Sequence, residues 1–291
     1  MTKTGIARDF TKKRFWAKFS TQTLACVGFF AVIAGLTDVL FPNVVPKIGL
    51  PLAIVTIVVS LGYGLYRSWP RPVMQSYNSP NTEIHVIEGD LFDQEGNTVI
   101  GMADTFDTEI PNIIDENGIQ AQLLTRIYHN DLRALDGALA SALNTHTIDH
   151  RFKPEDGKPG KQDAYPVGTV VTISPAIRRL FFCLAYTEMN KLNEARGTVD
   201  GVWRSLNNLW DEVRTKGNGG PISIAVIGGG QARISQYLPA QDSIRFIALS
   251  YMFASRKEKV ASRLNIVATR SVVKNLDMLE IQAFLKSLRP S

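Results

Sequence analysis

The chain has 291 residues, enough for a membrane segment and one domain with a full hydrophobic core. Its net charge is +5 and its isoelectric point is about 9.2. Residues 1–71 hold nine lysines and arginines against two aspartates, so the remainder carries a net charge of −2. The basic character therefore belongs to the N-terminal segment, and it does not indicate a nucleic-acid partner.

Two long apolar runs follow the basic N-terminus. The first, residues 24–41, carries only the charge of Asp38, and the second, residues 48–66, carries none. Each is about long enough to cross a hydrocarbon core of ~30 Å, and two prolines lie in the short connection between them. We expect a transmembrane helical hairpin over residues 21–67. The alternative is a buried pair of helices inside a soluble domain.

The distribution of positive charge predicts how the hairpin is oriented. Six lysines and arginines precede the first run, two follow the second, and only Lys47 lies in the connection. The positive-inside rule therefore predicts a multi-pass protein of the cell inner membrane with both termini in the cytoplasm. Residues 1–20 are expected to be a basic cytoplasmic segment, either solvated or lying as a helix on anionic lipid. Cys26 and Cys183 should both be reduced.

Residues 68–80 contain three prolines and are expected to form an extended linker, so that the domain covers residues 81–291. In the domain, apolar segments alternate with helical patterns. Strands are expected at 83–88, 97–103, 169–173, 180–185, 222–227 and 264–268. Helices are expected at 119–144 with a break and an N-cap at Asp131, at 198–215 with Thr198 as N-cap, at 242–255 and at 275–288. Apolar strands separated by helices predict a mostly parallel sheet covered on both faces, an α/β/α sandwich.

The sharpest local signal for a ligand site is the glycine-rich stretch after the strand expected at 222–227. Gly228, Gly229 and Gly230 are followed by Gln231 and Arg233 at the start of an expected helix. Glycines let backbone N–H groups approach an anion, and a helix N-terminus adds partial positive charge. This loop suits a diphosphate, which Arg233 would also contact. The alternative is a tight strand-to-helix turn without a ligand.

Two further strands end in glycine and acidic residues. Gly89, Asp90 and Leu91 follow the first, and the second runs through Gly101 and Ala103 into Asp104. The carboxyl ends of parallel strands meet at one edge of an open α/β sheet, where ligands bind. All three motifs should therefore converge on one crevice, although each one taken singly also fits an ordinary turn.

The sequence predicts neither a metal site nor a catalytic nucleophile. His146 and His150 have the spacing of two ligands on one helix face, but no glutamate pattern or cysteine pair accompanies them. No serine lies in a glycine elbow, and no cysteine is paired with a histidine. The candidate site residues are therefore ligand-binding rather than catalytic.

These motifs resemble those of a known family. Residues 86–92 look like the strand-to-loop Gly-Asp element of macro domains, and residues 224–230 look like their phosphate-binding loop, with Gly228 and Gly230 in the Gly-x-Gly positions. Residues 99–108, which include Phe-Asp-Thr, are similar to the variant macro domain of the Thoeris antiphage effectors. In that variant a two-span membrane hairpin precedes the macro domain, which is the arrangement expected here.

The resemblance implies a ligand and a biological setting. Macro domains bind ADP-ribose and its relatives, so Asp90 is expected to contact adenine and Gly228 to Gly230 to hold the diphosphate. No other cofactor is implied. The Thoeris setting implies a signal made from NAD by a partner TIR-domain enzyme, an ADP-ribose conjugate. It also implies a membrane attack that stops phage spread by harming the host cell, known as abortive infection.

The chain departs from hydrolytic macro domains, because their Asn-rich loop is replaced by Gly101-Met-Ala-Asp104. The resemblance therefore favours a reader over an enzyme. The leading hypothesis is a ligand-gated effector that acts on the lipid bilayer as a homo-oligomer, since one hairpin is too small to enclose a pore. The alternatives are a membrane-anchored ADP-ribosyl hydrolase and a non-catalytic membrane scaffold.

Overall fold

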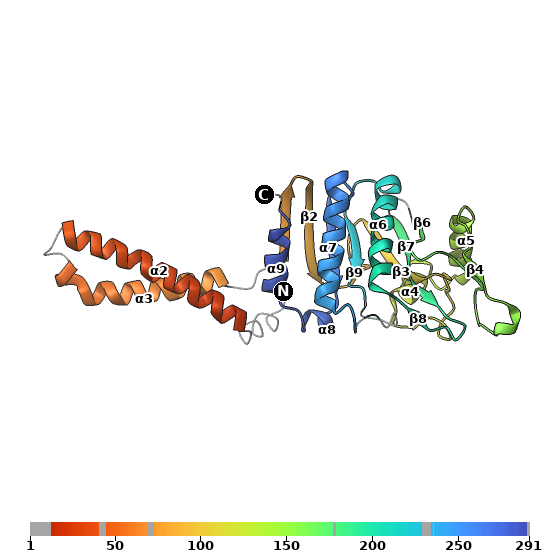
Figure 1. The fold of residues 1–291 in the computed structure, drawn as a ribbon, viewed down its shortest axis with the longest axis horizontal. Helices are drawn as coiled ribbons and strands as arrows, with labels where there is room; N and C mark the ends of the chain where they lie inside the picture. The colour runs from red at the N-terminus through yellow and green to blue at the C-terminus, as the bar shows by residue number, and fades with distance from the viewer. Residues whose placement is uncertain are drawn as a thin grey trace. The chain divides into compact units, whose positions relative to one another are not determined.

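The computed structural model describes residues 13–40, 45–68, 73–176, 179–228, 234 and 236–289. The chain divides into two compact units (Figure 1). One unit contains the two N-terminal helices, together with residues 277–279. The other unit, which begins at Val73, contains the sheet and the helices that cover it. The division between helical segment and α/β domain therefore falls close to residue 72.

Helices α2 (Lys13–Leu40) and α3 (Val45–Ser68) pack against each other. Phe15–Leu40 and Gly49–Ser68 are long and apolar enough, by length and composition, to cross a membrane. The two helices approach closely at Gly64, where an added Cβ would collide with Thr23 Oγ1. Large apolar side chains stand exposed along both helices, among them Leu24, Phe29, Leu36, Val39, Leu50 and Val58. Helix α2 begins inside the segment that was expected to be a separate N-terminus.

The expected linker over residues 68–80 is corrected by the structure. Strand β1 (Val73–Asn78) pairs antiparallel with β2 (Asn81–Glu88). Its residues alternate strictly between buried and exposed, as one strand face packed on a core requires. The three prolines of this stretch lie before and after β1 in the sequence, so none of them interrupts the strand. Residues 69–72 lie outside the described part of the chain. The domain therefore begins about eight residues earlier than predicted.

The sheet is mostly parallel, as predicted. Its remaining strands are β3 (Asn97–Ala103), β6 (Val170–Ala176), β7 (Arg179–Met189), β8 (Ala195–Arg196), β9 (Ile222–Ala225) and β10 (Arg263–Ala268). The order is β1-β2-β10-β9-β3-β7-β6, with β8 paired to β7. Strands β2, β10, β9, β3 and β7 run parallel, whereas β1 and β6 are antiparallel edges. A separate pair joins β4 (His150–Arg151) to β5 (Asp163–Ala164).

The helices follow the predicted order with one break. They are α4 (Ile119–Gln122), a π-helical turn (Leu123–Ile127), α5 (Leu132–Leu143), a 3-10 turn (Pro154–Asp156), α6 (Val199–Lys216), α7 (Ala240–Lys257), α8 (Arg270–Val273) and α9 (Met278–Ser287). Both predicted N-caps are confirmed: Asp131 accepts a hydrogen bond from Ala134 N at 2.9 Å, and Thr198 Oγ1 accepts one from Gly201 N at 3.0 Å. These caps fix where α5 and α6 begin.

Helices cover both faces of the sheet. Helices α6 and α7 lie side by side across one face (Figure 1), where Trp210 Nε1 donates a hydrogen bond to Ser250 Oγ at 2.9 Å. Helix α5 and the π-helical turn pack through Leu123 and Leu135 into a cluster that includes Phe181. Because side chains alternate along β7, the neighbouring Phe182 faces the other way and is also fully buried. The α/β/α prediction is confirmed.

A buried ion pair fixes the connection that follows β3. Lys158 Nζ lies 3.0 Å from Asp107 Oδ2, and the two side chains are 0% and 1% exposed. Asp107 also accepts hydrogen bonds from Thr105 Oγ1 at 2.7 Å and from Lys161 N at 2.6 Å. Gly160 packs onto this carboxylate with φ +82°, where a side chain would collide with it. The loop around Lys158 is thereby clamped onto the β3–α4 connection.

We predict that Asp107→Ala strongly destabilises the domain. The substitution leaves the Lys158 ammonium buried without its carboxylate, which typically costs about 3–5 kcal/mol of unfolding free energy. Urea denaturation of the full-length protein measures this loss. Glu155→Ala is the matched control, because its carboxylate is exposed and only weakly paired with Lys153. Equal midpoints for the two variants would contradict the prediction.

Candidate functional site

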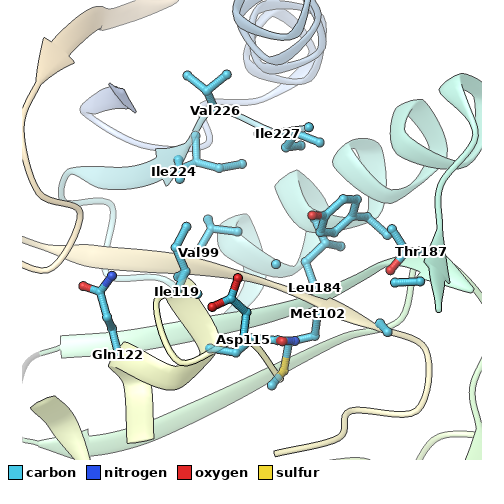
Figure 2. A pocket seen from close by; sticks show the side chains of 18 of the residues that line it. Val99, Met102, Asp115, Ile119, Gln122, Leu184, Thr187, Ile224, Val226 and Ile227 are labelled. Carbon is cyan, nitrogen blue, oxygen red and sulfur yellow. The ribbon is translucent and has the colours of Figure 1, made fainter. Parts of the chain in front are cut away.

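A cavity of about 330 Å³ lies at the carboxyl ends of the parallel strands. Figure 2 shows its walls: Val99 and Met102 from β3, Leu184 and Thr187 from β7, Ile224, Val226 and Ile227 from β9 and the turn after it, and Asp115, Ile119 and Gln122 from α4 and the turn before it. Its volume falls within the range of small-molecule sites. Its place matches the edge at which open α/β sheets bind ligands.

The lining is mostly apolar and contains few charges. Among the lining residues that the structure describes, Asp115 is the charged one, and none is a lysine or arginine. The Asp115 carboxylate accepts a hydrogen bond from Asn117 N at 2.9 Å within the turn that leads into α4. No lysine or arginine of the described lining can therefore pair with an anionic ligand. The described donors are backbone N–H groups and neutral side chains such as Gln122 and Thr269.

The glycine-rich loop reaches the cavity through Gly228. This residue lines the cavity, is buried and has φ +95°, a backbone conformation that favours glycine. It lies in the turn after β9, and Val226 N extends the pairing of that strand by donating to Val267 O at 3.1 Å. Four other predicted residues of this loop lie outside the described residues, namely Gly229, Gly230, Gln231 and Arg233. Their ligand contacts stay a prediction.

The end of β3 also meets the cavity. Gly101 and Ala103 line it, whereas Asp104 is buried just beyond them and is not among the described lining residues. Asp104 accepts a hydrogen bond from Met189 N at 2.9 Å, and its own N–H donates to Thr187 O at 2.9 Å. Burial raises the pKa of the Asp104 carboxyl to about 6. The residue therefore joins the ends of β3 and β7 behind the cavity wall.

Asp90 and Leu91 lie beside the cavity rather than in its described lining. Asp90 accepts hydrogen bonds from Phe92 N at 2.8 Å and from Arg126 Nη1 at 2.7 Å. Arg126 also contacts Gln122 Oε1 at 3.3 Å, and Gln122 does line the cavity. Leu91 is buried in the core. The structure thus links Asp90 to the cavity through Arg126, and its contact with a base stays a prediction.

The sequence analysis missed three parts of the cavity. They are the start of α4 from Asn117 to Gln122, the end of β7 at Tyr186, Thr187 and Met189, and the end of β10 with α8, at Ala268, Thr269 and Val272. The rule that located the β3 and β9 motifs applies equally to the ends of β7 and β10. The ends of β7 and β10 carry apolar and hydroxyl-bearing residues instead of glycines or acids, so the sequence gives no local signal for them.

Two further groups of side chains are the histidines, considered as metal ligands, and Cys183, considered as a nucleophile. The described residues contain no cluster of three or more His, Cys, Asp and Glu side chains able to hold a metal ion. His150 Nδ1 lies 3.1 Å from Asp149 Oδ2, an exposed contact between neighbours in sequence. Cys183 is fully buried in β7, and burial raises the pKa of its thiol to about 12. The thiolate required for nucleophilic attack is therefore scarcely populated at neutral pH.

The comparisons with known proteins address the family directly. A family model described as "Thoeris protein ThsA, Macro domain" matches residues 84–269, well over half of the chain. The chain belongs to this family. A curated relative, Thoeris protein ThsA from Bacillus amyloliquefaciens (strain Y2), is 20% identical over 215 residues, which cover 72% of this chain and 70% of the relative. The resemblance to Thoeris effectors with a macro domain is thereby confirmed.

Solved structures with similar coordinates include the Oceanobacillus iheyensis macrodomain with ADP and the same macrodomain with MES bound. The first is 13% identical, covers 75% of this chain and 97% of that chain, and has a TM-score of 0.46. The second is 16% identical, covers 75% and 98%, and also has a TM-score of 0.46. Membership of the ThsA macro family rests on the family match and not on these similarities.

We predict that the charge of Asp104 makes stability depend on pH. Its raised pKa means that the folded state favours the neutral carboxyl, so the stability it contributes is present below about pH 4 and lost as pH rises through about 6. Asp104→Asn removes the charge and keeps an oxygen that can accept from Met189 N. Relative to this variant, the wild type should lose on the order of 2 kcal/mol of unfolding free energy between pH 4 and pH 7.5.

Chemical denaturation at a series of pH values measures this difference. Glu155→Gln provides the control, because it exchanges an exposed carboxylate for an amide without changing a buried charge. If the difference between wild type and Asp104→Asn were constant across the range, burial of a charge at Asp104 would not be the cause.

Proposed function

We propose that this chain is a membrane-anchored effector of antiphage defence whose macro domain senses an NAD-derived ADP-ribose derivative. One observation supports the proposal most directly. This chain, a member of the ThsA macro family, has its cavity at the carboxyl ends of the parallel strands, and Gly228 lines that cavity. The apolar helices α2 and α3 support the membrane anchor. A TIR-domain partner enzyme acting on NAD would supply the signal.

The proposed ligand extends along the strand ends. Its adenine lies near Asp90 and Leu91 at the end of β2, and its diphosphate lies on the loop of Gly228, Gly229 and Gly230, with Gln231 and Arg233 beside it. The remaining part lies over Gly101, Ala103 and Asp104. The described lining lacks cationic side chains, which favours backbone N–H groups as the donors to a diphosphate.

The site fits a domain that binds the ligand without catalysis better than it fits an enzyme. Gly101 and Ala103 have no side-chain group that could carry or position a proton. Asp104, whose pKa of about 6 would suit a general base, is buried behind the wall and accepts a hydrogen bond from Met189 N. That pKa is the observation in favour of the second candidate, a membrane-anchored ADP-ribosyl hydrolase. Release of ADP-ribose from a modified substrate would decide between the two.

Damage to a membrane would require several copies of the chain. A two-helix hairpin satisfies its backbone hydrogen bonds internally and encloses no polar interior. Gly64 is used in packing α3 against α2, whereas positions Gly28 and Gly35 on α2 have no neighbouring atom within 4 Å of an added Cβ. Small residues at such open positions allow close approach of another helix. We therefore include ligand-driven homo-oligomerisation in the proposal.

The first test is ligand binding. ADP-ribose should raise the melting temperature of the full-length protein in detergent, because a ligand that binds only the folded state stabilises it. Gly229→Glu should abolish this shift, since it adds bulk and negative charge to the loop assigned to the diphosphate. Gly137→Glu is the matched control: Gly137 is exposed on α5, and an added Cβ there meets no atom within 4 Å.

The base subsite has its own matched pair of variants. Asp90→Ala should weaken ADP-ribose binding by about 1–3 kcal/mol if a hydrogen bond to the base is lost. Asp93→Ala removes the other carboxylate that pairs with Arg126, at 2.7 Å, and should leave binding nearly unchanged. Equal losses in both variants would show that the effect comes from Arg126, and unchanged binding in both would refute the assignment of Asp90.

The second test is membrane damage. Dye-loaded liposomes that contain the full-length protein should leak when ADP-ribose is added, because the ligand shifts the domain toward an assembling state. A chain without residues 1–70 should bind the same ligand, as seen in its melting temperature, and cause no leakage. Leakage that is the same with and without ligand, or equal damage by the shortened chain, would contradict the proposal.

A further inference from the structure

The sheet has two edges, and they differ in how they are protected. One edge is β6, which contains Pro175 and loses its regular register against β7 between Ile173 and Ala176. Prolines and bulges both hinder the addition of another strand to an edge. The other edge is β1, which pairs with β2 in unbroken register. Residues 73–78 of β1 therefore lack the proline, the bulge and the charges that usually protect an edge strand.

The hydrogen bonds of β2 show which side of β1 is free. Glu83 N donates to Ser262 O at 3.1 Å, on the side of β2 that faces β10. Because backbone N–H groups alternate in direction along a strand, the even-numbered residues of β2 bond to β1. Their partners in β1 are Val73, Gln75 and Tyr77. The backbone groups of the remaining residues of β1 therefore point away from the sheet, namely those of Met74, Ser76 and Asn78.

This outer side of β1 is open in the part of the chain that the structure describes. The side chains of Met74, Ser76 and Asn78 are exposed, and that of Met74 is 52% exposed. Among the described residues, no backbone hydrogen bond joins these positions to a segment other than β2. The Ser76 carbonyl accepts from Gln75 Nε2 at 2.8 Å, which leaves its second lone pair available. Free donors and acceptors along an edge form a template for a further strand.

The pattern of free backbone groups is complementary to itself. When two copies of β1 run antiparallel about a two-fold axis at Ser76, the Ser76 residues of the two copies face each other. Met74 of each copy then faces Asn78 of the other. Residues that face each other in this way exchange N–H···O=C hydrogen bonds in both directions. Such an interface uses the same surface on both copies, as two-fold dimers of identical chains do.

The side chains of β1 also permit this self-pairing. Like charges directly opposite each other destabilise a strand pair, and residues 73–78 carry no charge. The side chains that meet at the axis are serines, which are small and can hydrogen-bond to each other. Opposite Ser76 in β2 lies Glu83, which accepts from Ser76 Oγ at 3.3 Å. The two Glu83 residues of a pair are separated by three strand spacings, about 14 Å, which exceeds the Debye length at physiological ionic strength.

We propose that β1 is the surface through which the domains of two copies of this chain associate, edge to edge as antiparallel strands with a two-fold axis at Ser76. The eight-stranded sheet of one copy then continues into that of the other. This inference rests on the homo-oligomerisation included in the proposed function, and it names the domain surface that performs it. Two copies close the interface, so a larger assembly needs a second contact.

The first test compares two substitutions at the axis. Ser76→Pro removes the outward N–H without removing a bond to β2, and proline is tolerated at such a position of an edge strand. Ser76→Ala keeps the N–H and loses the same side-chain bond to Glu83, which makes it the matched control. Sedimentation equilibrium of the full-length protein in detergent with ADP-ribose measures the dissociation constant of the dimer. Ser76→Pro should raise this constant at least about tenfold, because both central hydrogen bonds are lost, whereas Ser76→Ala should change it less than about threefold.

Disulfide cross-linking tests the same interface without a proline. In a chain with Cys26→Ala, the remaining native thiol is Cys183, which is fully buried. Adding Ser76→Cys should allow diamide to oxidise two chains to a disulfide-linked dimer, because facing residues of a hydrogen-bonded antiparallel pair lie about 5.5 Å apart at Cα. Asn78→Cys is the control. Its residue faces Met74, so the two introduced cysteines are about 14 Å apart along the strands and should not cross-link.

The outcomes distinguish this inference from the proposed function. If Ser76→Pro folds and dimerises as wild type does, or if Ser76→Cys forms no cross-link where wild type dimerises, β1 is not the interface while ligand-driven assembly stands. Should Ser76→Pro fail to fold, as its melting temperature would show, the two cysteine variants decide. Equal cross-linking of both cysteine variants would also overturn the proposed pairing. If wild type stays a single chain with and without ADP-ribose, the proposed homo-oligomerisation fails and this inference fails with it.

Discussion

The site depends on one constraint, the parallel alignment of five strands. Because β2, β10, β9, β3 and β7 run in the same direction, their carboxyl ends meet at a single edge. Turns at such an edge can present backbone N–H groups to an anion, and no described lining residue is a lysine or arginine. Gly228, with φ +95°, shows the backbone freedom that such a turn requires.

One wall of the cavity at this edge of the sheet has to be held in place. That wall comes from the long β3–α4 connection, which has little regular structure of its own. The buried pair of Asp107 and Lys158 clamps it to a distant loop, and Gly160 in that loop packs so closely that a side chain would strike both Asp107 and Ile113. Ile113 in turn lines the cavity. Charges buried away from any proposed ligand thus determine the shape of the ligand site.

Sequence reasoning succeeded where the signal was local. The bounds of β3 at Asn97–Ala103, the caps at Asp131 and Thr198 and the turn at Gly228 are all specified by neighbouring residues. It failed for β1, because this segment becomes a strand by pairing with β2. The prolines on either side of it had suggested a linker. It also missed features with distant partners. Arg126 meets Asp90 across 36 residues, and the bulge at Tyr186 exists only in the register of β7 against β3.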